Sequence, residues 1–308
     1  MVGTVAVVGL GNMGGGMART LLRAGVPTLG VDPVPGVAER FDGGLEVVAL
    51  AEAVRRAGTL VLSLPGSAVV EQVLGEAGLL GPGVDHRLVV DTSTSDPLAT
   101  RRLAAATAAA GHALVDAPVS GGPAGAESGT LTVFLGGEDD AVAEAAPVLQ
   151  VLAGRVTHVG GPGAGNVAKL VNNMLCAVHL QAAGEALDLG RAAGLDPARL
   201  LEAVNGASGR SAVTEVNLPR WVLSGSFDSG FPVGLMTRDV ELAVSTAAGL
   251  GVDLPLAAGS AAAWRELRDE DAAADFNRMA DRDRVAERGR AADRERVTDR
   301  EQEAGTSK

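Results

Sequence analysis

Short apolar segments alternate with helix-periodic segments through the first half of the chain. The strand-like segments are rich in valine and leucine, and they span residues 5–8, 28–32, 59–64, 87–91 and 113–116. Between them, apolar residues recur at helical spacing over 13–24, 50–56, 69–77 and 98–110. This alternation predicts a doubly wound parallel sheet with helices on both faces, extended by two further strands at 130–136 and 155–159.

The pattern changes at Gly163, after which nearly every apolar segment has helical spacing. Residues 166–193 predict one long helix that ends before Gly194, and Asp196-Pro197 is typical of a helix start. Further helices are predicted at 198–204, 218–223 and 233–248. The fold class is therefore α/β, with an α/β domain over 1–162 and an all-helical domain over 163–268. The charged tail over 269–308 is expected to be partly helical or disordered.

Composition narrows the class of protein. The 308 residues suffice for two domains, and the net charge of −12 argues against a nucleic-acid partner. No apolar segment has the length of a membrane span, and the first residues lack a secretory signal pattern. The single cysteine, Cys176, excludes an internal disulfide, and the histidines lack partners at ligand spacing, so no metal is expected. We expect a cytoplasmic protein without a membrane partner.

A glycine-rich loop follows the first predicted strand and precedes the first predicted helix. In VVGLGNMGGG, Gly9, Gly11 and Gly14 form the pattern G-x-G-x-x-G. The first glycine permits a tight turn, the second lets a pyrophosphate approach the backbone, and the third lets the helix pack on the strand. The remaining residues of the loop are Leu10, Asn12 and Met13. The loop predicts a dinucleotide site in a Rossmann-type domain, with phosphates at the helix N-terminus.

Asp32 stands at the end of the second strand, about 20 residues after the glycine loop, where dinucleotide-binding folds carry an acid. A carboxylate there accepts hydrogen bonds from the adenosine ribose and repels a 2′-phosphate. The next three residues are Pro-Val-Pro and include no arginine that could bind such a phosphate. The cofactor is therefore expected to be NAD rather than NADP. The alternative is a structural glycine turn with an incidental surface acid.

Ser120, Gly121 and Gly122 follow the fifth strand, at the edge where open α/β sheets bind ligands. A hydroxyl and exposed backbone N–H groups suit a small carboxylate, although these residues are also typical of an ordinary flexible turn. Lys169 and Asn173 lie four residues apart and so share one face of the long helix. A lysine shielded from water can exchange protons near neutral pH. The alternative is a lysine that extends from a packed helix to solvent.

Four motifs occur in order along the chain: GLGNMGGGMARTL at 9–21, DTSTSDP at 91–97, DAPVSGGPAGAESGTL at 116–131 and GAGNVAKLVNN at 163–173. They resemble GLGxMGxxMAxNL, DxSTxxP, DAPVSGGxxxAxxGTL and GxGxxxKxxNN of the β-hydroxyacid dehydrogenase family, in particular its 3-hydroxyisobutyrate dehydrogenase branch. The resemblance extends from residue 4 to about residue 256 and leaves only the charged tail uncovered.

The resemblance implies a role for each matched position. Lys169 would be the general acid and base, and Asn173 would help to hold the substrate. Ser120, Gly121 and Gly122 would receive the substrate carboxylate. Besides the glycine loop and Asp32, the cofactor would be bound by Leu64, Pro65, Thr94, Phe231 and Arg238. The implied activity is hydride transfer between NAD and a short 3-hydroxy acid, giving the semialdehyde or keto acid. A homodimer or homotetramer is also implied, because the long helix of such enzymes commonly packs against a second subunit.

Two departures and three alternatives accompany this resemblance. Arg238 replaces a family lysine, and Ala212 stands where many relatives carry a large residue, which implies a roomier substrate pocket. A decarboxylating 6-phosphogluconate-type enzyme would need a glutamate where Cys176 stands. The second alternative is an imine or aldehyde/semialdehyde reductase of the same superfamily, of which imine reductases usually replace the lysine with Asp or Tyr. A non-catalytic dinucleotide-binding module is the third alternative, and such relatives lose the lysine.

Overall fold

The computed structural model describes residues 2–281. These residues divide into two compact units, one formed by 2–173 with 245–253, and the other by 174–244 with 254–281. Helix α7 (Ala164–Ala192) contributes to both units. The domain limits expected at residues 162 and 268 stay predictions.

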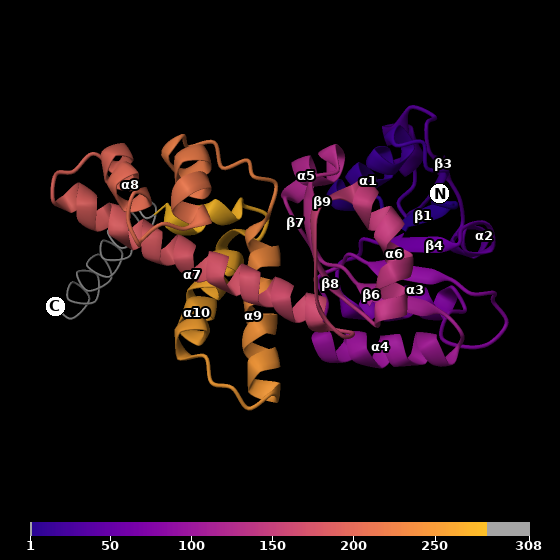
Figure 1. The fold of residues 1–308 in the computed structure, drawn as a ribbon. Helices are drawn as coiled ribbons and strands as arrows, with labels where there is room; N and C mark the ends of the chain where they lie inside the picture. The colour runs from indigo at the N-terminus through magenta and orange to yellow at the C-terminus, as the bar shows by residue number, and fades with distance from the viewer. Residues whose placement is uncertain (1, 282–308) are drawn as a thin grey trace, which may run out of the picture. The chain divides into compact units, whose positions relative to one another are not determined.

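A nine-stranded sheet forms the centre of the first unit (Figure 1). Its strands are β1 (Val5–Val8), β2 (Thr28–Val31), β3 (Glu46–Val47), β4 (Thr59–Leu62), β5 (Leu88–Asp91), β6 (Ala113–Asp116), β7 (Val119–Ser120), β8 (Leu131–Gly136) and β9 (Ala153–Gly160). Their order is β3-β2-β1-β4-β5-β6-β8-β7, and β9 pairs with β8. Strands β1 to β6 are parallel, whereas β8 runs antiparallel to β6 and β7. The predicted doubly wound sheet is confirmed, with antiparallel pairing added at one side.

Helices cover both faces of this sheet. They are α1 (Asn12–Arg23), η1 (Val37–Phe41), α2 (Leu50–Arg56), α3 (Ser67–Glu76), α4 (Pro97–Ala109), α5 (Gly122–Ser128) and α6 (Asp139–Leu152). Successive residues of β1 point to opposite faces, so Val7 shares one core cluster with Met17 of α1, and Val8 shares the other with Leu74 of α3. Burial on both faces explains why β1, β2 and β4 show no alternation of apolar and polar residues, whereas β9 is mostly exposed.

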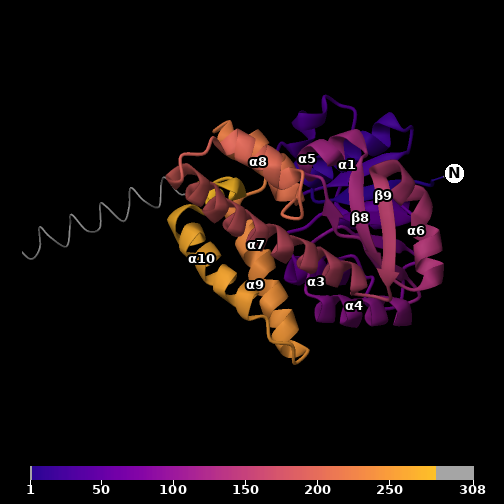
Figure 2. The same cartoon turned by 60° about the vertical axis from the view of Figure 1, so that its left-hand side comes forward.

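The second unit is helical. Its elements are the later part of α7, α8 (Pro197–Asn205), the π-helix η2 (Val213–Leu223), α9 (Val233–Gly249) as far as Val244, α10 (Pro255–Asp271) and η3 (Phe276–Ala280). Helices α9 and α10 lie side by side in both views (Figures 1 and 2), and the Thr237 hydroxyl of α9 donates to the Trp264 carbonyl of α10 at 3.1 Å. Trp264 is fully buried in the core of this unit.

The beginning of the predicted charged tail is folded. Residues 269–271 complete α10, and η3 follows, with Phe276 and Ala280 7% and 2% exposed in the core of the second unit. Phe276 and Ala280 belong to no periodic apolar pattern, so the sequence did not predict their burial. The rest of the predicted tail, 282–308, lies outside the described residues.

Candidate active site

Most of the predicted site residues follow the carboxyl ends of neighbouring parallel strands. The glycine loop follows β1, Leu64 and Pro65 follow β4, Thr94 follows β5, and Ser120 lies shortly after β6. Because these four strands are adjacent and parallel, their carboxyl ends form one edge of the sheet. Open α/β sheets bind ligands at this edge. We call it the carboxyl edge below.

The glycine loop has the geometry that a dinucleotide requires. Gly9 has a φ of +89°, which favours glycine, and a Cβ at Gly14 would collide with the Gly9 carbonyl oxygen. A Cβ at Gly11 would have no heavy atom within 4 Å, so open space adjoins the loop where the helix begins. The N-cap of α1 is Gly11, with no side chain capping the first N–H groups. These residues fit a pyrophosphate at the N-terminus of α1.

Asp32 lies beside the glycine loop. Its Oδ2 accepts a hydrogen bond from Leu10 N at 2.7 Å, and its Oδ1 accepts one from Val34 N at 2.8 Å. Each carboxylate oxygen has a second lone pair, so both can also accept hydrogen bonds from a ribose. Arg40 of η1 donates to the Leu10 carbonyl at 3.2 Å, which brings a cation to the same loop. Sequence reasoning missed Arg40, since it follows Asp32 by eight residues and belongs to no motif.

The serine–glycine segment changes direction after β7. Gly121 and Gly122 have φ values of +126° and +63°, which L side chains rarely adopt. A Cβ at Gly122 would have no heavy atom within 4 Å, so its surroundings are open. Ser120 pairs with Thr132 of β8, which fixes the segment to the sheet. A small anion could therefore reach backbone N–H groups and a hydroxyl at one place.

Lys169 and Asn173 are both buried, at 7% and 4% exposure. Asn173 accepts a hydrogen bond from the Asn172 side chain at 3.1 Å through its Oδ1. The burial of Lys169 does not fit the alternative of a lysine extended into solvent. The only other lysine of the chain is Lys308, and every other basic side chain except the four histidines is an arginine. Arginine cannot release a proton at physiological pH, whereas a buried lysine can.

Buried polar residues connect α7 to the carboxyl edge. The carboxylate of Asp116, at the end of β6, accepts hydrogen bonds from Gly163 N and Asn166 N, each at 2.8 Å. The Asn166 side chain accepts one from Ser95 N at 2.8 Å. The predicted motifs contain these residues, but nothing in the sequence indicates that they contact one another.

Two buried acids lie side by side at the ends of neighbouring strands. Asp91 of β5 stands opposite Asp116 of β6 in the parallel register. Burial, the largest cause, and the neighbouring Asp116 together raise the pKa of Asp91 to about 7, although hydrogen bonds from Ser93 and Ser95 oppose the shift. Burial also raises the pKa of Asp116, although hydrogen bonds from Gly163 N and Asn166 N oppose the shift. The two carboxyl groups thus stand close together in a site away from water.

Asp91 also acts on the segment after β4. Its Oδ1 accepts a hydrogen bond from Ser93 N at 3.0 Å, and the Ser93 hydroxyl oxygen accepts one from Leu64 N at 3.0 Å. A buried acid and a serine therefore hold the backbone of that segment at Leu64, which is a predicted cofactor residue. Thr94, also predicted, follows Ser93 directly and is half-buried.

Phe231 and Arg238 belong to the second unit. Phe231 packs edge-to-face against Phe276, with ring centroids 5.4 Å apart. Arg238 pairs with the buried Asp239, with 2.7 Å between Nη2 and Oδ1. Their assignment to the cofactor site stays a prediction.

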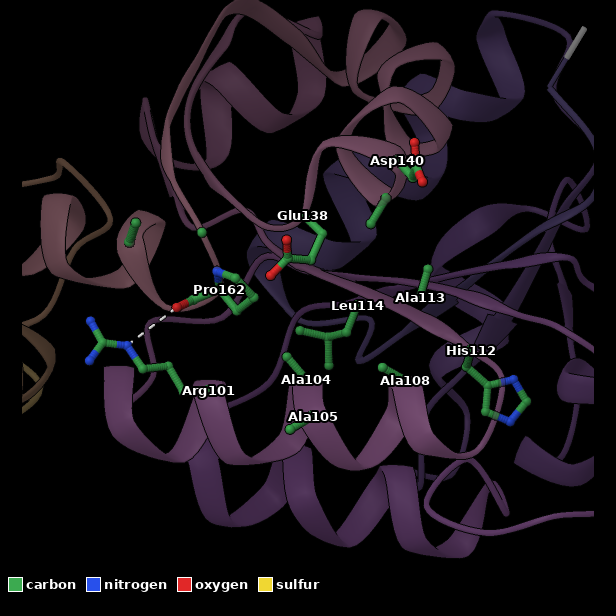
Figure 3. A pocket seen from close by; sticks show the side chains of 13 residues that line it. Arg101, Ala104, Ala105, Ala108, His112, Ala113, Leu114, Glu138, Asp140 and Pro162 are labelled. Atoms are coloured by element: carbon green, nitrogen blue, oxygen red, sulfur yellow. Dashed lines mark hydrogen bonds between the residues drawn. The ribbon is translucent and has the colours of Figure 1, made fainter.

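A groove of about 630 Å³ opens between α4 and α6 (Figure 3). Alanines 104, 105 and 108 of α4 line one wall, and Glu138, Asp140 and Ala141 line the other. Arg101 donates from Nε to the Pro162 carbonyl at its end. None of the predicted site residues lines this groove. The groove therefore gives no support to the predicted site, whose residues stay assigned to the carboxyl edge as a prediction.

None of the helices between residues 2 and 281 combines the length and apolar character that crossing a lipid bilayer requires. Over the same residues, no group of three or more His, Cys, Asp or Glu side chains is placed to hold a metal ion.

A doubly wound sheet with this glycine loop and acid defines a dinucleotide-binding protein. Residues 4–160 match the model of the NAD-binding domain of 6-phosphogluconate dehydrogenase. Residues 163–282 match the model described as the NAD-binding region of NADP-dependent 3-hydroxyisobutyrate dehydrogenase. The chain therefore belongs to the β-hydroxyacid dehydrogenase family of NAD(P)-dependent oxidoreductases, and to its 3-hydroxyisobutyrate dehydrogenase-like branch.

Named relatives support this membership. A 3-hydroxyisobutyrate dehydrogenase of Pseudomonas aeruginosa is 39% identical over 265 residues, covering 82% of this chain and 88% of the relative. A 2-(hydroxymethyl)glutarate dehydrogenase of Eubacterium barkeri is 36% identical and covers 82% and 85%. The solved structure of the Mycobacterium tuberculosis 3-hydroxyisobutyrate dehydrogenase with L-serine is 33% identical. It matches with a TM-score of 0.84 over 91% of this chain and 98% of that one.

Proposed function

We propose that this chain oxidises a short 3-hydroxy acid with NAD and that Lys169 takes the proton of the alcohol. The observation that carries the proposal is the burial of Lys169 one helical turn from Asn173, on a helix tied to the carboxyl edge. A bound nicotinamide dinucleotide supplies the hydride acceptor. The chain's own residues orient the alcohol and exchange its proton.

Each predicted residue has a distinct task in this reaction. The Lys169 amine accepts the proton from the hydroxyl oxygen during oxidation and returns it during reduction. The Asn173 amide holds the same oxygen without protonating it. Ser120 and the N–H groups of Gly121 and Gly122 bind the carboxylate, which leaves the carbinol carbon in one orientation.

The relatives suggest the substrate class. The names 3-hydroxyisobutyrate and 2-(hydroxymethyl)glutarate both describe a hydroxymethyl group on the carbon that bears a carboxylate. They differ in the other substituent of that carbon. We infer that this chain accepts a 3-hydroxypropanoate core with a substituent at carbon 2. Ala212, in place of a large residue, favours a larger substituent.

Asp32 supports NAD as the preferred dinucleotide. Its carboxylate is fixed beside the glycine loop by Leu10 N and Val34 N, where it would repel a 2′-phosphate. Arg40, at the same loop, would attract that phosphate. We therefore propose a preference for NAD with measurable use of NADP.

We also propose that the chain forms a homo-oligomer through α7. Within the second unit, Leu175, His179, Ala182, Ala186 and Leu189 form an exposed stripe along α7, with the exposed Glu185 beside it. We call it the outer face of α7. Leu175 and Leu189 are 46% and 74% exposed. A stripe of this kind on one helix is typical of helix–helix packing between subunits.

Two variants of Lys169 test the reaction. Lys169→Ala removes the amine, and Lys169→Arg keeps the charge but cannot release a proton at physiological pH. We expect both to lose at least about 100-fold in kcat, the usual range for a general acid or base. NADH binding, measured by fluorescence titration, should change less than about twofold. Oxidation of 3-hydroxyisobutyrate by Lys169→Arg at the wild-type rate would contradict proton transfer by this amine.

A further inference from the structure

The first turn of α7 is held by buried side chains from outside the helix. We propose that Asp116 and Asn166 are positioning residues that fix the direction in which Lys169 projects from α7. This inference rests on the proposed role of Lys169. Under this proposal, Asp116 and Asn166 take no part in the chemical step themselves.

Asp116 anchors the start of the helix. Its side chain is fully buried, with Oδ1 accepting from Gly163 N and Oδ2 from Asn166 N, each at 2.8 Å. The first N–H groups of a helix have no acceptor within it, and a negative charge there is favourable. Since its two oxygens bind different residues of the turn, the carboxylate restrains both the axial position and the rotation of α7.

Asn166 adds a second restraint, three residues before Lys169. It is fully buried, and its Oδ1 accepts from Ser95 N at 2.8 Å while its Nδ2 donates to the Thr100 hydroxyl at 3.1 Å. Ser95 lies in the segment after β5, and Thr100 lies in α4. One amide therefore joins α7 to two different elements.

Close packing removes the remaining freedom of this turn. A Cβ at Gly165 would lie 2.6 Å from the Asp116 carbonyl oxygen, and a Cβ at Gly136 would lie 2.6 Å from Gly165 N. Real Cβ contacts essentially never approach below 3.0 Å. The backbone of α7 thus touches the ends of β6 and β8 directly, and the helix cannot shift toward them.

The consequence concerns the end of a long side chain. A small rotation of α7 moves the Lys169 amine much farther than it moves the backbone, because the amine lies far from the helix axis. Displacing a reacting group by about 1 Å can cost about 100-fold in rate. Asp116 and Asn166 therefore act on turnover through Lys169.

The experiment compares substitutions of two buried threonines of α4, Thr100 and Thr107. Thr100 contacts Asn166, whereas Thr107 donates only to Leu103 O and Ala104 O of its own helix. Thr100→Val should lower kcat about 10-fold and Asn166→Ala about 100-fold, with KM for NAD within about twofold. Thr100→Ser should restore kcat, and Thr107→Val should lower it less than about twofold. Exchange of the backbone amides at positions 163 and 166, measured without cofactor, should accelerate at least about 10-fold in Asn166→Ala.

A double variant distinguishes failure of this inference from failure of the proposed function. In Lys169→Ala, the further change Asn166→Ala should cost no additional turnover, because Asn166 acts through the lysine. The positioning role is overturned if Asn166→Ala lowers turnover in Lys169→Ala by the same factor as in the wild-type enzyme. Unchanged amide exchange in Asn166→Ala would overturn it as well. If Asn166→Ala does not fold, the comparison of Thr100→Val with Thr107→Val tests the proposal. Equal kcat values in these two variants would overturn the positioning role. Wild-type turnover in Lys169→Ala would instead refute the proposed function, and amide exchange would still test the anchoring of α7.

Discussion

Asp91 and Asp116 stand opposite one another at the ends of β5 and β6, and each acid holds a different part of the candidate site. Asp91 acts through Ser93 on the backbone of Leu64, on the proposed cofactor side. Asp116 binds the start of α7, the helix that carries Lys169. Two buried carboxyl groups in neighbouring strands thus hold the backbone at Leu64 and at the start of α7.

The first prediction concerns the stability of this pair against pH. Burial raises the pKa of Asp91 from 3.8 to about 7, so between these values the folded state holds a proton that the unfolded state has released. The free energy of unfolding therefore falls as pH rises from about 4 to about 7. The Asp91 contribution to this fall is up to about 4 kcal/mol. Urea unfolding of wild type and Asp91→Asn at pH 5, 6, 7 and 8 measures it.

Asp91→Asn should lose this part of the pH dependence, because its amide does not titrate. The matched control is Asp85→Asn, a change at an exposed aspartate just before β5, which should keep the wild-type slope. A wild-type stability that rises between pH 5 and 7, with Asp91→Asn following the same curve, would contradict the assignment.

The second prediction concerns the choice of dinucleotide. Wild type should have a higher kcat/KM with NAD than with NADP. Arg40→Ala should leave kcat/KM for NAD within about twofold and lower it for NADP about 10-fold, the worth of one charge-assisted hydrogen bond. Asp32→Asn should change the preference in the opposite direction, because the charge that repels the 2′-phosphate is lost.

Steady-state kinetics with both dinucleotides measure these ratios. Arg55→Ala, which removes an exposed arginine from α2, is the control and should leave both values unchanged. Equal loss of NAD and NADP use in Arg40→Ala would show that Arg40 supports the loop rather than a phosphate.

The third prediction concerns assembly through the outer face of α7. Leu189 is 74% exposed, and Leu189→Glu would place a charge in an interface between subunits. We expect light scattering coupled to size exclusion to give an oligomer for wild type and the monomer mass for this variant. Leu256→Glu is the control, since Leu256 is 72% exposed but lies on α10. A monomeric wild type, or an unchanged mass for Leu189→Glu, would be evidence against this interface.

Local chemistry explains what could be predicted about the elements and motifs. The β strands appear as short valine-rich segments because both sheet faces are buried, and the glycine loop is visible because only glycine permits its turns. Strands β3 and β7 were not predicted, since each has two residues and no periodicity. The antiparallel pairing of β8 was not predicted either, because it depends on the short helix α5 between β7 and β8, which no periodicity indicates.

The sequence by itself determined the α/β class, the alternation of its main strands and helices, the glycine loop with Asp32, and the lysine and asparagine four residues apart on one helix. These follow from spacing along the chain. Only the tertiary structure decided that Asp116 binds residues 47 and 50 positions later, and that Arg40 reaches Leu10, 30 positions earlier. Such contacts depend on how strands and helices pack, and packing joins residues that no periodicity relates.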